Sequence, residues 1–162
     1  MDNGLIANIL VESMSEDHVT IIKKLSEPKR DEEIAAELNV KETIVRTLLN
    51  DLHARSLVEY ERTKDKRTGW YTYLWKKRDG KVREYIHNYL QNKLDNLCQK
   101  LDEEKDCTTF RCSCSRVSFE RAIDTYFICP ECNEPYVNFD NSDEIIKIET
   151  EIAKINNFLK SI

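Results

Sequence analysis

The sequence has little glycine and little proline, with only 3 of each among 162 residues. All-β sandwiches and barrels need many turn residues, so this scarcity excludes them and favours a chain dominated by helices. No apolar run approaches the roughly 20 residues that a membrane-spanning helix needs. Residues 1–10 also lack the basic stretch that opens a signal peptide. We therefore expect a soluble, intracellular protein with no membrane partner.

Cysteine is absent from residues 1–97, and all 6 cysteines come later. Five of them lie between Cys107 and Cys132. Disulfide frameworks of secreted proteins rarely occupy only one part of a chain, so this clustering indicates a metal site.

The formal net charge of -5 excludes a generic polyanion binder of the histone or polybasic-tail kind. The charge is unevenly distributed, however. Between Glu59 and Arg83, nine Lys and Arg residues outnumber four acids, which gives this stretch a local net charge of +5. The rest of the chain is acidic.

Three short helices are predicted before residue 56. The apolar residues of the first are Val19, Ile22 and Leu25. The second begins at Asp31, whose carboxylate can cap the free amides of the first turn, and it ends at Asn39. The third spans residues 41–55. Its apolar face is formed by Ile44, Val45, Leu48, Leu49 and Leu52.

The sequence period changes after the third helix. Residues 57–62 and 70–76 are typical of strands, and the charged residues 63–69 are typical of a turn between them. A β-hairpin that follows a helix-turn-helix is a wing. Residues 1–79 are therefore predicted to form a winged helix-turn-helix domain.

Helical periodicity returns in two longer segments. Residues 80–106 form a predicted helical linker of coiled-coil type, with an apolar stripe of Ile86, Leu90, Leu94, Leu97 and Leu101. Residues 140–162 form a predicted terminal amphipathic helix, with a heptad seam of Ile145, Ile148, Ile152, Ile155, Leu159 and Ile162. The two stripes are expected to face each other, and Cys98 is expected to be partly buried. The fold class is α+β and mostly α.

Residues 107–139 carry the strongest chemical signal in the chain. The predicted metal ligands are Cys112, Cys114, Cys129 and Cys132, with Cys107 as a substitute for one of the first pair. Two sulfur atoms on a tight turn can approach one tetrahedral zinc ion, and a second pair completes the site. We expect one structural Zn²⁺ per chain in a zinc ribbon. Four protein ligands leave no open position for water or substrate, so the metal would organise the fold and perform no chemistry.

The third helix is the candidate recognition helix, but its outward residues are mixed in charge. Those residues are Lys41, Glu42, Thr43, Arg46, Thr47, Asn50, Asp51 and Arg55. Because Glu42 and Asp51 would repel phosphates, sequence-specific reading of a major groove is not favoured.

The hairpin is better suited to nucleic acid. Its candidate contact residues combine cations with aromatic rings: Arg62, Lys64, Lys66, Arg67, Trp70 and Tyr71. Such a mixture suits unpaired or distorted strands, because rings stack on bases while cations hold the backbone. We also expect half of the four aromatic residues among 70–75 to pack as core under the wing, namely Trp75 with Tyr73 or Tyr71.

Two other functional classes compete with this interpretation. A sequence-specific or metal-responsive winged-helix repressor would use the cysteines as its sensor and the terminal heptad seam to dimerise. An enzyme is not expected, because the sequence shows no paired carboxylates at catalytic spacing, no Gly-rich phosphate loop and no nucleophile elbow.

The order of these parts resembles that of archaeal transcription factor E, the counterpart of the amino-terminal half of the alpha subunit of eukaryotic general factor IIE. The resemblance covers nearly the whole chain. Its most specific segments are residues 31–35, 44–46 with 48–49, 64–75 (KDKRTGWYTYLW), 117–122, 127–132 (FICPEC) and 140–142.

The resemblance implies a general, or basal, transcription initiation factor. Such factors are understood to join RNA polymerase, TATA-binding protein and transcription factor B in the preinitiation complex. They bind the polymerase clamp and stalk, and they promote or stabilise promoter opening near the non-template DNA strand. We accordingly expect a monomer in the cytoplasm of an archaeal cell, associated with the nucleoid through the transcription machinery. Whether a beta partner subunit exists is left open.

The chain departs from the family pattern at two places. The usual CxxC of the first zinc knuckle is shortened to Cys112-Ser113-Cys114. Asn133 stands where glycine commonly follows the final cysteine, and asparagine tolerates the left-handed backbone that this position often requires.

Overall fold

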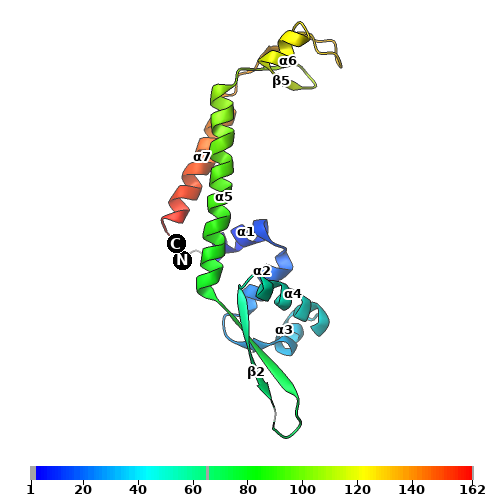
Figure 1. Ribbon diagram of the computed structural model, residues 1–162, viewed down its shortest axis with the longest axis vertical. Coiled ribbons are helices and arrows are strands. Elements are labelled where there is room, and N and C mark those ends of the chain that lie inside the picture. The colour runs from blue at the N-terminus through cyan, green and yellow to red at the C-terminus, as the bar shows by residue number, and fades with distance from the viewer. Residues whose placement is uncertain (1–2, 65, 162) are drawn as a thin grey trace. The chain divides into compact units, whose positions relative to one another are not determined.

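The structure, a computed structural model, describes residues 3–64 and 66–161. It divides into two compact units, Met1–Tyr89 and Leu90–Ile162, and helix α5 (Asp79–Asp106) runs from the first into the second (Figure 1). The fold is mixed α and β with mostly helix, which confirms the predicted class. The finer division into four segments stays a prediction. Across the described ranges, no helix combines the length and the apolar character needed to span a membrane.

The first unit begins with four helices in the described residues. They are α1 (Asn3–Ser13), α2 (Glu16–Lys24), α3 (Asp31–Leu38) and α4 (Glu42–Ala54). The last three confirm the predicted helices within about two residues, whereas α1 was not predicted. The sequence there has apolar residues at nearly consecutive positions, 5–7 and 9–11, instead of one stripe at spacings of three and four.

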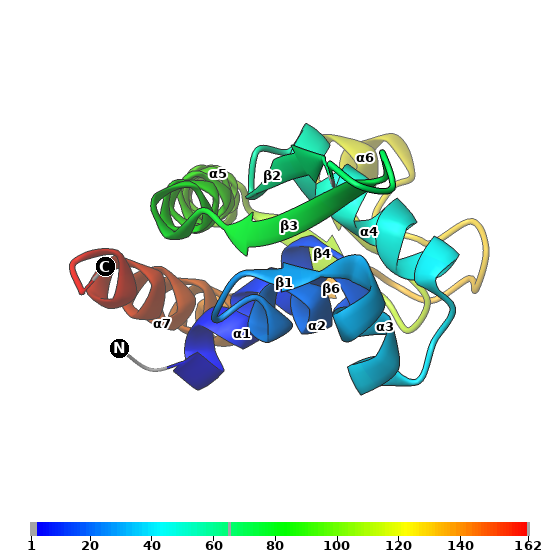
Figure 2. The same ribbon diagram turned by 90° about the horizontal axis from the view of Figure 1, so that it is seen from below.

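A three-stranded antiparallel sheet completes this unit. Its strands are β1 (Lys29–Arg30), β2 (Val58–Lys64) and β3 (Tyr71–Lys77), in the order β1-β3-β2. The β2–β3 hairpin confirms the predicted wing. Gly69 adopts a positive φ of 74°, which glycine accepts without strain, in the turn between the strands. Seen from below, α2, α3 and α4 gather beside the hairpin (Figure 2).

The core of the first unit lies between these helices and the base of the wing. Its most deeply buried side chains are Val19, Ile21, Leu25, Ile34, Val45, Leu49, Leu52, Leu57, Val58 and Ile86. Most of the predicted apolar positions are therefore confirmed. Ile44 is an exception, because its side chain is 48% exposed. The buried stripe of α4 follows Val45, Leu49 and Leu52, and Ile44 lies one position outside it.

Asp31 does not cap α3, and that prediction was wrong. The carboxylate of Glu33 instead accepts a hydrogen bond from the backbone N–H of Arg30, with an N–O distance of 2.9 Å. Asp31 is buried, and its carboxylate pairs with the guanidinium of Arg46 on α4. Asp31 lies within the first turn of α3, and its ion pair with Arg46 joins α3 to α4.

The second unit contains a small sheet, a short helix and a long terminal helix. The strands are β4 (Thr109–Arg111), β5 (Arg116–Ser118) and β6 (Val137–Asn138), in the order β5-β4-β6. Helix α6 (Phe119–Asp124) follows β5, and α7 (Ser142–Leu159) follows β6.

Helix α7 returns beside the second half of α5, as the two predicted stripes require (Figure 1). Ion pairs join the helices, with N–O distances of 3.1 Å for Lys93–Glu151 and 2.7 Å for Lys105–Glu149. Ile155 is buried in the seam, and the other predicted seam residues through Leu159 are half-buried, while Ile162 lies outside the described residues. Cys98 is exposed, which corrects its predicted burial, because it lies one position away from the apolar stripe of α5.

Candidate metal centre and nucleic-acid interface

Two turns of the second unit bring four cysteines together. Cys112 and Cys114 follow strand β4, and Cys129 and Cys132 follow helix α6. Their sulfur atoms all lie within 4.8 Å of one another. The Sγ–Sγ distance is 3.5 Å for Cys112–Cys114 and also 3.5 Å for Cys114–Cys129.

These separations fit a tetrahedral zinc site. With zinc–sulfur bonds of about 2.3 Å, the sulfur atoms of a tetrahedron lie about 3.8 Å apart. The four cysteines can therefore hold one metal ion after small adjustments of their side chains. Cys107 is exposed just beyond the end of α5 and is not part of this group.

Backbone hydrogen bonds shape both knuckles. The N–H of Cys112 donates to the carbonyl of Ser115 at 3.0 Å, and the N–H of Cys129 donates to the carbonyl of Glu134 at 2.9 Å. Asn133 closes the second knuckle with a φ of 61°. The left-handed backbone expected at this position is thus confirmed, and asparagine adopts it at low cost.

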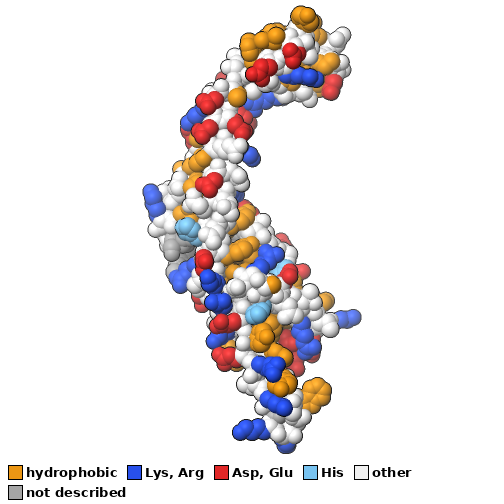
Figure 3. All heavy atoms as spheres, in the orientation of Figure 1, with side chains coloured by type: hydrophobic (Ala, Val, Ile, Leu, Met, Phe, Trp, Pro, Cys, Tyr) orange, Lys and Arg blue, Asp and Glu red, His pale blue; other side chains and the backbone are white. Residues whose placement is uncertain are grey.

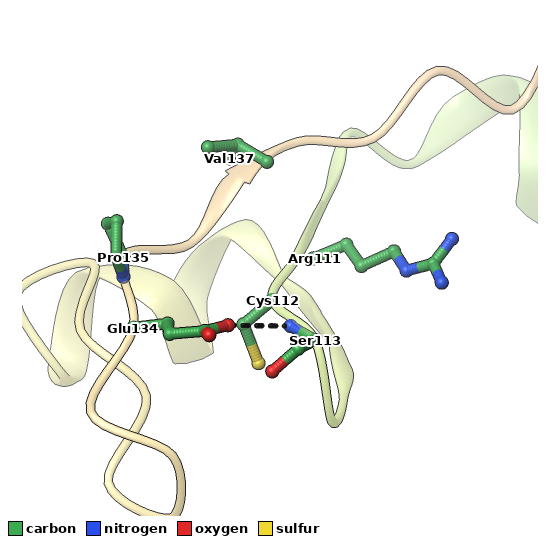
Figure 4. Close-up of a pocket in the computed structure, with 6 residues that line it drawn as sticks. All are labelled: Arg111, Cys112, Ser113, Glu134, Pro135 and Val137. Atoms are coloured by element: carbon green, nitrogen blue, oxygen red, sulfur yellow. Dashed lines mark hydrogen bonds between the residues drawn. The ribbon is translucent and has the colours of Figure 1, made fainter.

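Glu134 links the two knuckles and was not singled out from the sequence. Its carboxylate accepts a hydrogen bond from the backbone N–H of Ser113, at an N–O distance of 3.2 Å (Figure 4). The hydroxyl and the amide of Ser113 hold the pKa of Glu134 below its ordinary value. Since Ser113 stands between the two cysteines of the shortened knuckle, this bond fixes the turn where the sequence departs from the usual spacing. A nearby pocket of ≈ 390 Å³ is lined by Arg111, Cys112, Ser113, Glu134, Pro135 and Val137.

The thiols perturb one another strongly. The pKa of Cys114 is raised because its sulfur is surrounded by those of Cys132, Cys112 and Cys129. The pKa of Cys129 is lowered because the hydroxyl of Tyr136 and the backbone N–H of Cys132 donate to its sulfur. Four thiolates this close repel one another unless a cation lies between them. The donor set therefore suits a bound divalent metal.

The packed core of this module is small. Its buried residues are Cys112, Ala122, Cys129 and Tyr136, with Phe110, Val117, Phe127 and Cys132 packed against them. Two members are themselves metal-ligand candidates on turns. A core of this size supplies little stability, so a metal ion bound by the four cysteines would contribute much of the folding free energy of this module.

The wing has two faces with different chemistry. In the antiparallel ladder, Tyr60 lies opposite Trp75, Arg62 opposite Tyr73, and Lys64 opposite Tyr71, so these six side chains share one face. We call it the ring face. The other face carries Glu59 opposite Lys76, Glu61 opposite Leu74, and Thr63 opposite Thr72.

Aromatic contacts run along the ring face from the core toward the tip. Tyr60 lies between His53, Trp75 and Tyr73, at ring-centroid distances of 5.2, 4.9 and 5.2 Å. Of the four aromatic residues among 70–75, only Trp75 is buried. The expectation that half of them form core was therefore wrong, because the helices cover only the base of the hairpin. Tyr60 and Tyr73 belong to the exposed set, and strand alternation could have identified them.

The structure brings together some of the predicted contact residues. The guanidinium of Arg62 lies 3.9 Å from the ring centroid of Tyr71, and the ammonium of Lys64 lies 5.5 Å from it. Trp70 is 77% exposed beyond the start of β3. Lys66 and Arg67 lie in the exposed turn, next to the undescribed Asp65. Lys and Arg side chains gather with hydrophobic ones over this hairpin, at the lower end of Figure 3.

The outward surface of α4 offers less to a polyanion. All eight residues predicted to face outward are exposed. Arg46 is engaged by Asp31 and by Glu42, the latter at an N–O distance of 3.2 Å. Asp51 lies 3.2 Å from the Nε2 atom of His18. The cation nearest the middle of the helix is thus neutralised within the domain.

The family profile described as the TFIIE alpha subunit matches residues 4–107. Transcription factor E of Methanococcus maripaludis is 35% identical over 159 residues, which cover 94% of this chain and 90% of that protein. Transcription factor E of Methanocaldococcus jannaschii is 38% identical over 133 residues, covering 81% and 77%. A solved structure, a possible transcriptional regulator from Methanosarcina mazei Go1, has a similar fold with a TM-score of 0.50 at 17% identity, covering 60% of this chain and 84% of that one. The matched family is one of transcription factors and not of enzymes.

Proposed function

Because this chain belongs to the TFIIE alpha subunit family and is a general transcription initiation factor, we propose that its wing holds unpaired promoter DNA during initiation. The single observation that carries this proposal is the ring face of the hairpin. It joins exposed aromatic rings to cations on one side of the antiparallel β2–β3 hairpin.

The recognition helix is less suited to DNA than the wing. Phosphate binding depends on Lys and Arg side chains that are free to neutralise phosphates. In doing so they release the counterions condensed on the DNA. On α4, Arg46 is held by Asp31 and Glu42, and the carboxylates of Glu42 and Asp51 face outward. A sequence-specific repressor that reads a major groove is therefore not favoured.

The ring face matches the chemistry of a single strand. Exposed rings of Tyr60, Tyr71 and Tyr73 offer stacking surfaces, with exposed fractions of 41%, 45% and 36%. Arg62 and Lys64 lie beside them to contact the phosphates. A base stacked on an aromatic side chain gains roughly 1–3 kcal/mol, so one or two such contacts shift a balanced opening equilibrium about fivefold or more.

We further propose the protein's partners, its cellular location and its bound metal. The chain joins RNA polymerase, at its clamp and stalk, together with TATA-binding protein and transcription factor B on the promoter, and it contacts mainly the non-template strand. It works as a monomer in the archaeal cytoplasm and catalyses no reaction. One Zn²⁺ held by Cys112, Cys114, Cys129 and Cys132 organises the ribbon, for which the sulfur separations and the small core provide support.

Replacement of the exposed wing rings tests the proposal. Trp70→Ala and Tyr71→Ala are expected to reduce the permanganate reactivity of promoter thymines about fivefold on a weak promoter. Thermal unfolding and polymerase binding should remain at the parent level, because neither ring is buried.

Leu74→Ala is the matched control, since Leu74 lies on the opposite wing face and is 36% exposed, against 45% for Tyr71. It should open the promoter as the parent does. The proposal fails if both ring variants stay folded, bind polymerase and open the promoter as well as the parent protein.

A further inference from the structure

Tyr126 has an unusual backbone for a residue of its size. It follows helix α6 and its cap residue Thr125, with a φ of 52°. Its N–H donates to the carbonyl of Ile123 at 2.9 Å, and the N–H of Phe127 donates to the carbonyl of Ala122 at 2.7 Å. This pair of bonds is the Schellman closure of a helix, whose left-handed residue is usually glycine.

Two other helices of the chain close with the same pair of bonds but with smaller residues. Asn39 occupies the left-handed position after α3, with a φ of 54°, and Ser56 occupies it after α4, with a φ of 61°. Asparagine tolerates this region because its side chain bonds locally, whereas the β-carbon of a bulky residue is crowded there. Tyr126 is the bulky residue among these three helix ends.

Phe127 shares the strained backbone, with a φ of 58°, but its ring is used by the fold. The ring lies 5.1 Å from that of Phe110 and 6.3 Å from that of Phe119, between centroids. Tyr126 differs, because it is 88% exposed. Packing within the domain therefore offsets the strain at Phe127 and does not offset it at Tyr126. Backbone strain that packing within the fold does not offset indicates a functional role for the residue.

Other apolar side chains close to Tyr126 in the sequence are also exposed. Phe119 and Ile123 lie one helical turn apart on α6 and are 49% and 47% exposed, and Ile128 is 49% exposed. We call Phe119, Ile123, Tyr126 and Ile128 the ribbon patch. Hydrophobic side chains gather at this end of the second unit in Figure 3.

The charges near the ribbon patch favour a protein over nucleic acid as its ligand. Residues 119–131 contain three acids, Glu120, Asp124 and Glu131, against the single base Arg121. A phosphate backbone would be repelled by this excess of negative charge. An apolar protein pocket with a basic rim has the complementary chemistry, and tyrosine is among the residues most often found as anchors of such interfaces.

We propose that Tyr126 is the anchor of a protein-docking surface, the ribbon patch, whose occupant is an apolar, basic-rimmed pocket on RNA polymerase. The identity of the occupant rests on the function proposed above. With its left-handed backbone, Tyr126 leaves most of its side chain exposed to a partner, without any rearrangement of the ribbon. Preorganisation of this kind lowers the entropic cost of binding.

Tyr126→Gly separates a binding role from a folding role. Glycine accepts the left-handed backbone, so the zinc-loaded full-length variant should unfold at the same temperature as the parent or at a higher one. Its affinity for purified archaeal RNA polymerase without promoter DNA, followed by fluorescence anisotropy, should fall at least fivefold. Ile146→Ala is the control, since Ile146 is an apolar residue, 59% exposed on α7 and outside the ribbon patch, and its variant should bind as the parent does.

The outcomes separate the hypotheses. A loss of affinity below fivefold overturns the docking role, and so does a clear fall in the unfolding temperature, which would assign the ring to the fold. A variant that loses affinity for single-stranded DNA and not for polymerase would show a nucleic-acid site and also overturn it. If the parent chain itself does not bind polymerase, the function proposed above fails. If the parent and the Tyr126→Gly variant bind polymerase equally, only the docking role of Tyr126 fails.

Discussion

The wing and the ribbon both expose aromatic rings, but the neighbours of those rings carry opposite charge. On the wing, Arg62 and Lys64 lie over the ring of Tyr71. On the ribbon, Tyr126 stands in a segment where acids outnumber bases. An exposed ring has a face for stacking and an edge for apolar contact, so the ring alone does not select a ligand. The charge beside the ring decides between a polyanion and a protein.

The two regions also differ in what holds them in shape. The wing is a seven-residue ladder whose base, at Val58 and Trp75, is buried against the helices. The ribbon has strands of two or three residues, and two of its four buried residues, Cys112 and Cys129, are ligand candidates. Hydrogen bonds and apolar packing therefore stabilise the wing, whereas we expect the ribbon to rely on the metal ion proposed above.

Loss of the metal should have the largest effect and should divide the molecule. Structural zinc sites contribute apparent free energies of about 10–16 kcal/mol in small domains, far more than the ribbon core can replace. Cys129→Ser, or chelation of the parent, is expected to remove one zinc ion from the native mass spectrum and to unfold residues 107–139. Hydrogen exchange should increase throughout the ribbon and remain low in α4 and β3.

If backbone amides lost protection from hydrogen exchange in both units together, the wing would depend on the metal as well. That result would contradict the difference in stabilisation between wing and ribbon. Cys98→Ser provides the matched control. This exposed thiol lies outside the group of four, so its variant should keep zinc and protection.

Removal of wing cations should have an intermediate effect and should depend on salt. Each phosphate contact with a single strand contributes a slope of about 0.7 in log affinity against log salt concentration. Replacement of both Lys64 and Lys66 by Gln is therefore expected to weaken binding of a single-stranded oligonucleotide about tenfold at low salt. The slope should fall by about 1.4 in an anisotropy titration. An unchanged slope would show that these ammonium groups do not contact phosphates, and Tyr126→Gly should leave the slope as it is.

Removal of a ribbon carboxylate should have the smallest effect and should depend on pH. Glu104 at the end of α5 accepts two bonds from Arg116, at 3.1 and 2.6 Å, and one from the side-chain amide of Asn141, at 2.9 Å. The bonds from Arg116, and to a smaller extent the bond from Asn141, hold the pKa of Glu104 below its ordinary value of 4.5. A carboxyl group whose pKa is lower in the folded state stabilises that state at pH values above its ordinary, unfolded-state pKa. This stabilisation is lost as the pH falls through the folded-state pKa.

Glu104→Gln should therefore lower the free energy of unfolding of the zinc-loaded ribbon by about 1 kcal/mol at pH 7. The difference from the parent should shrink below about pH 4.5. Thermal unfolding at pH 7 and at about pH 5.5, where the thiolates still hold the metal, follows this trend, and a difference that grows at the lower pH would contradict the assigned pairing. Glu149→Gln is a control, because its pair with Lys105 is about half exposed and should contribute less.

Much of this architecture follows from periodicity in the sequence. The stripes of α2, α4, α5 and α7 repeat every three or four residues, and the cysteine spacing defines the ribbon. Helix α1 could not be predicted because its apolar residues show no single stripe. The role of Asp31 was missed because its partner, Arg46, lies 15 residues away and pairing at that distance depends on helix packing.

The candidate sites were predicted less completely than the fold. The exposed cations and Trp70 follow from composition, but the division of the wing into two faces depends on the register of β2 against β3. Glu134 could not be assigned to the metal centre, because its bond to Ser113 spans 21 residues between two turns. The strain at Tyr126 is a backbone angle, and no residue pattern in the sequence marks it.

The two faces of the wing also determine how a polyanion can approach it. A strand ladder is a single layer, so only the backbone separates the two sets of side chains. On one side stand Arg62 and Lys64, and on the other stand Glu59 and Glu61, which share the ammonium of Lys76 at 3.4 and 2.9 Å. A strand of nucleic acid is therefore drawn to one side and offered no net attraction on the other. In the proposed function, long-range charge would thus orient the DNA strand on the hairpin before any ring comes into contact with a base.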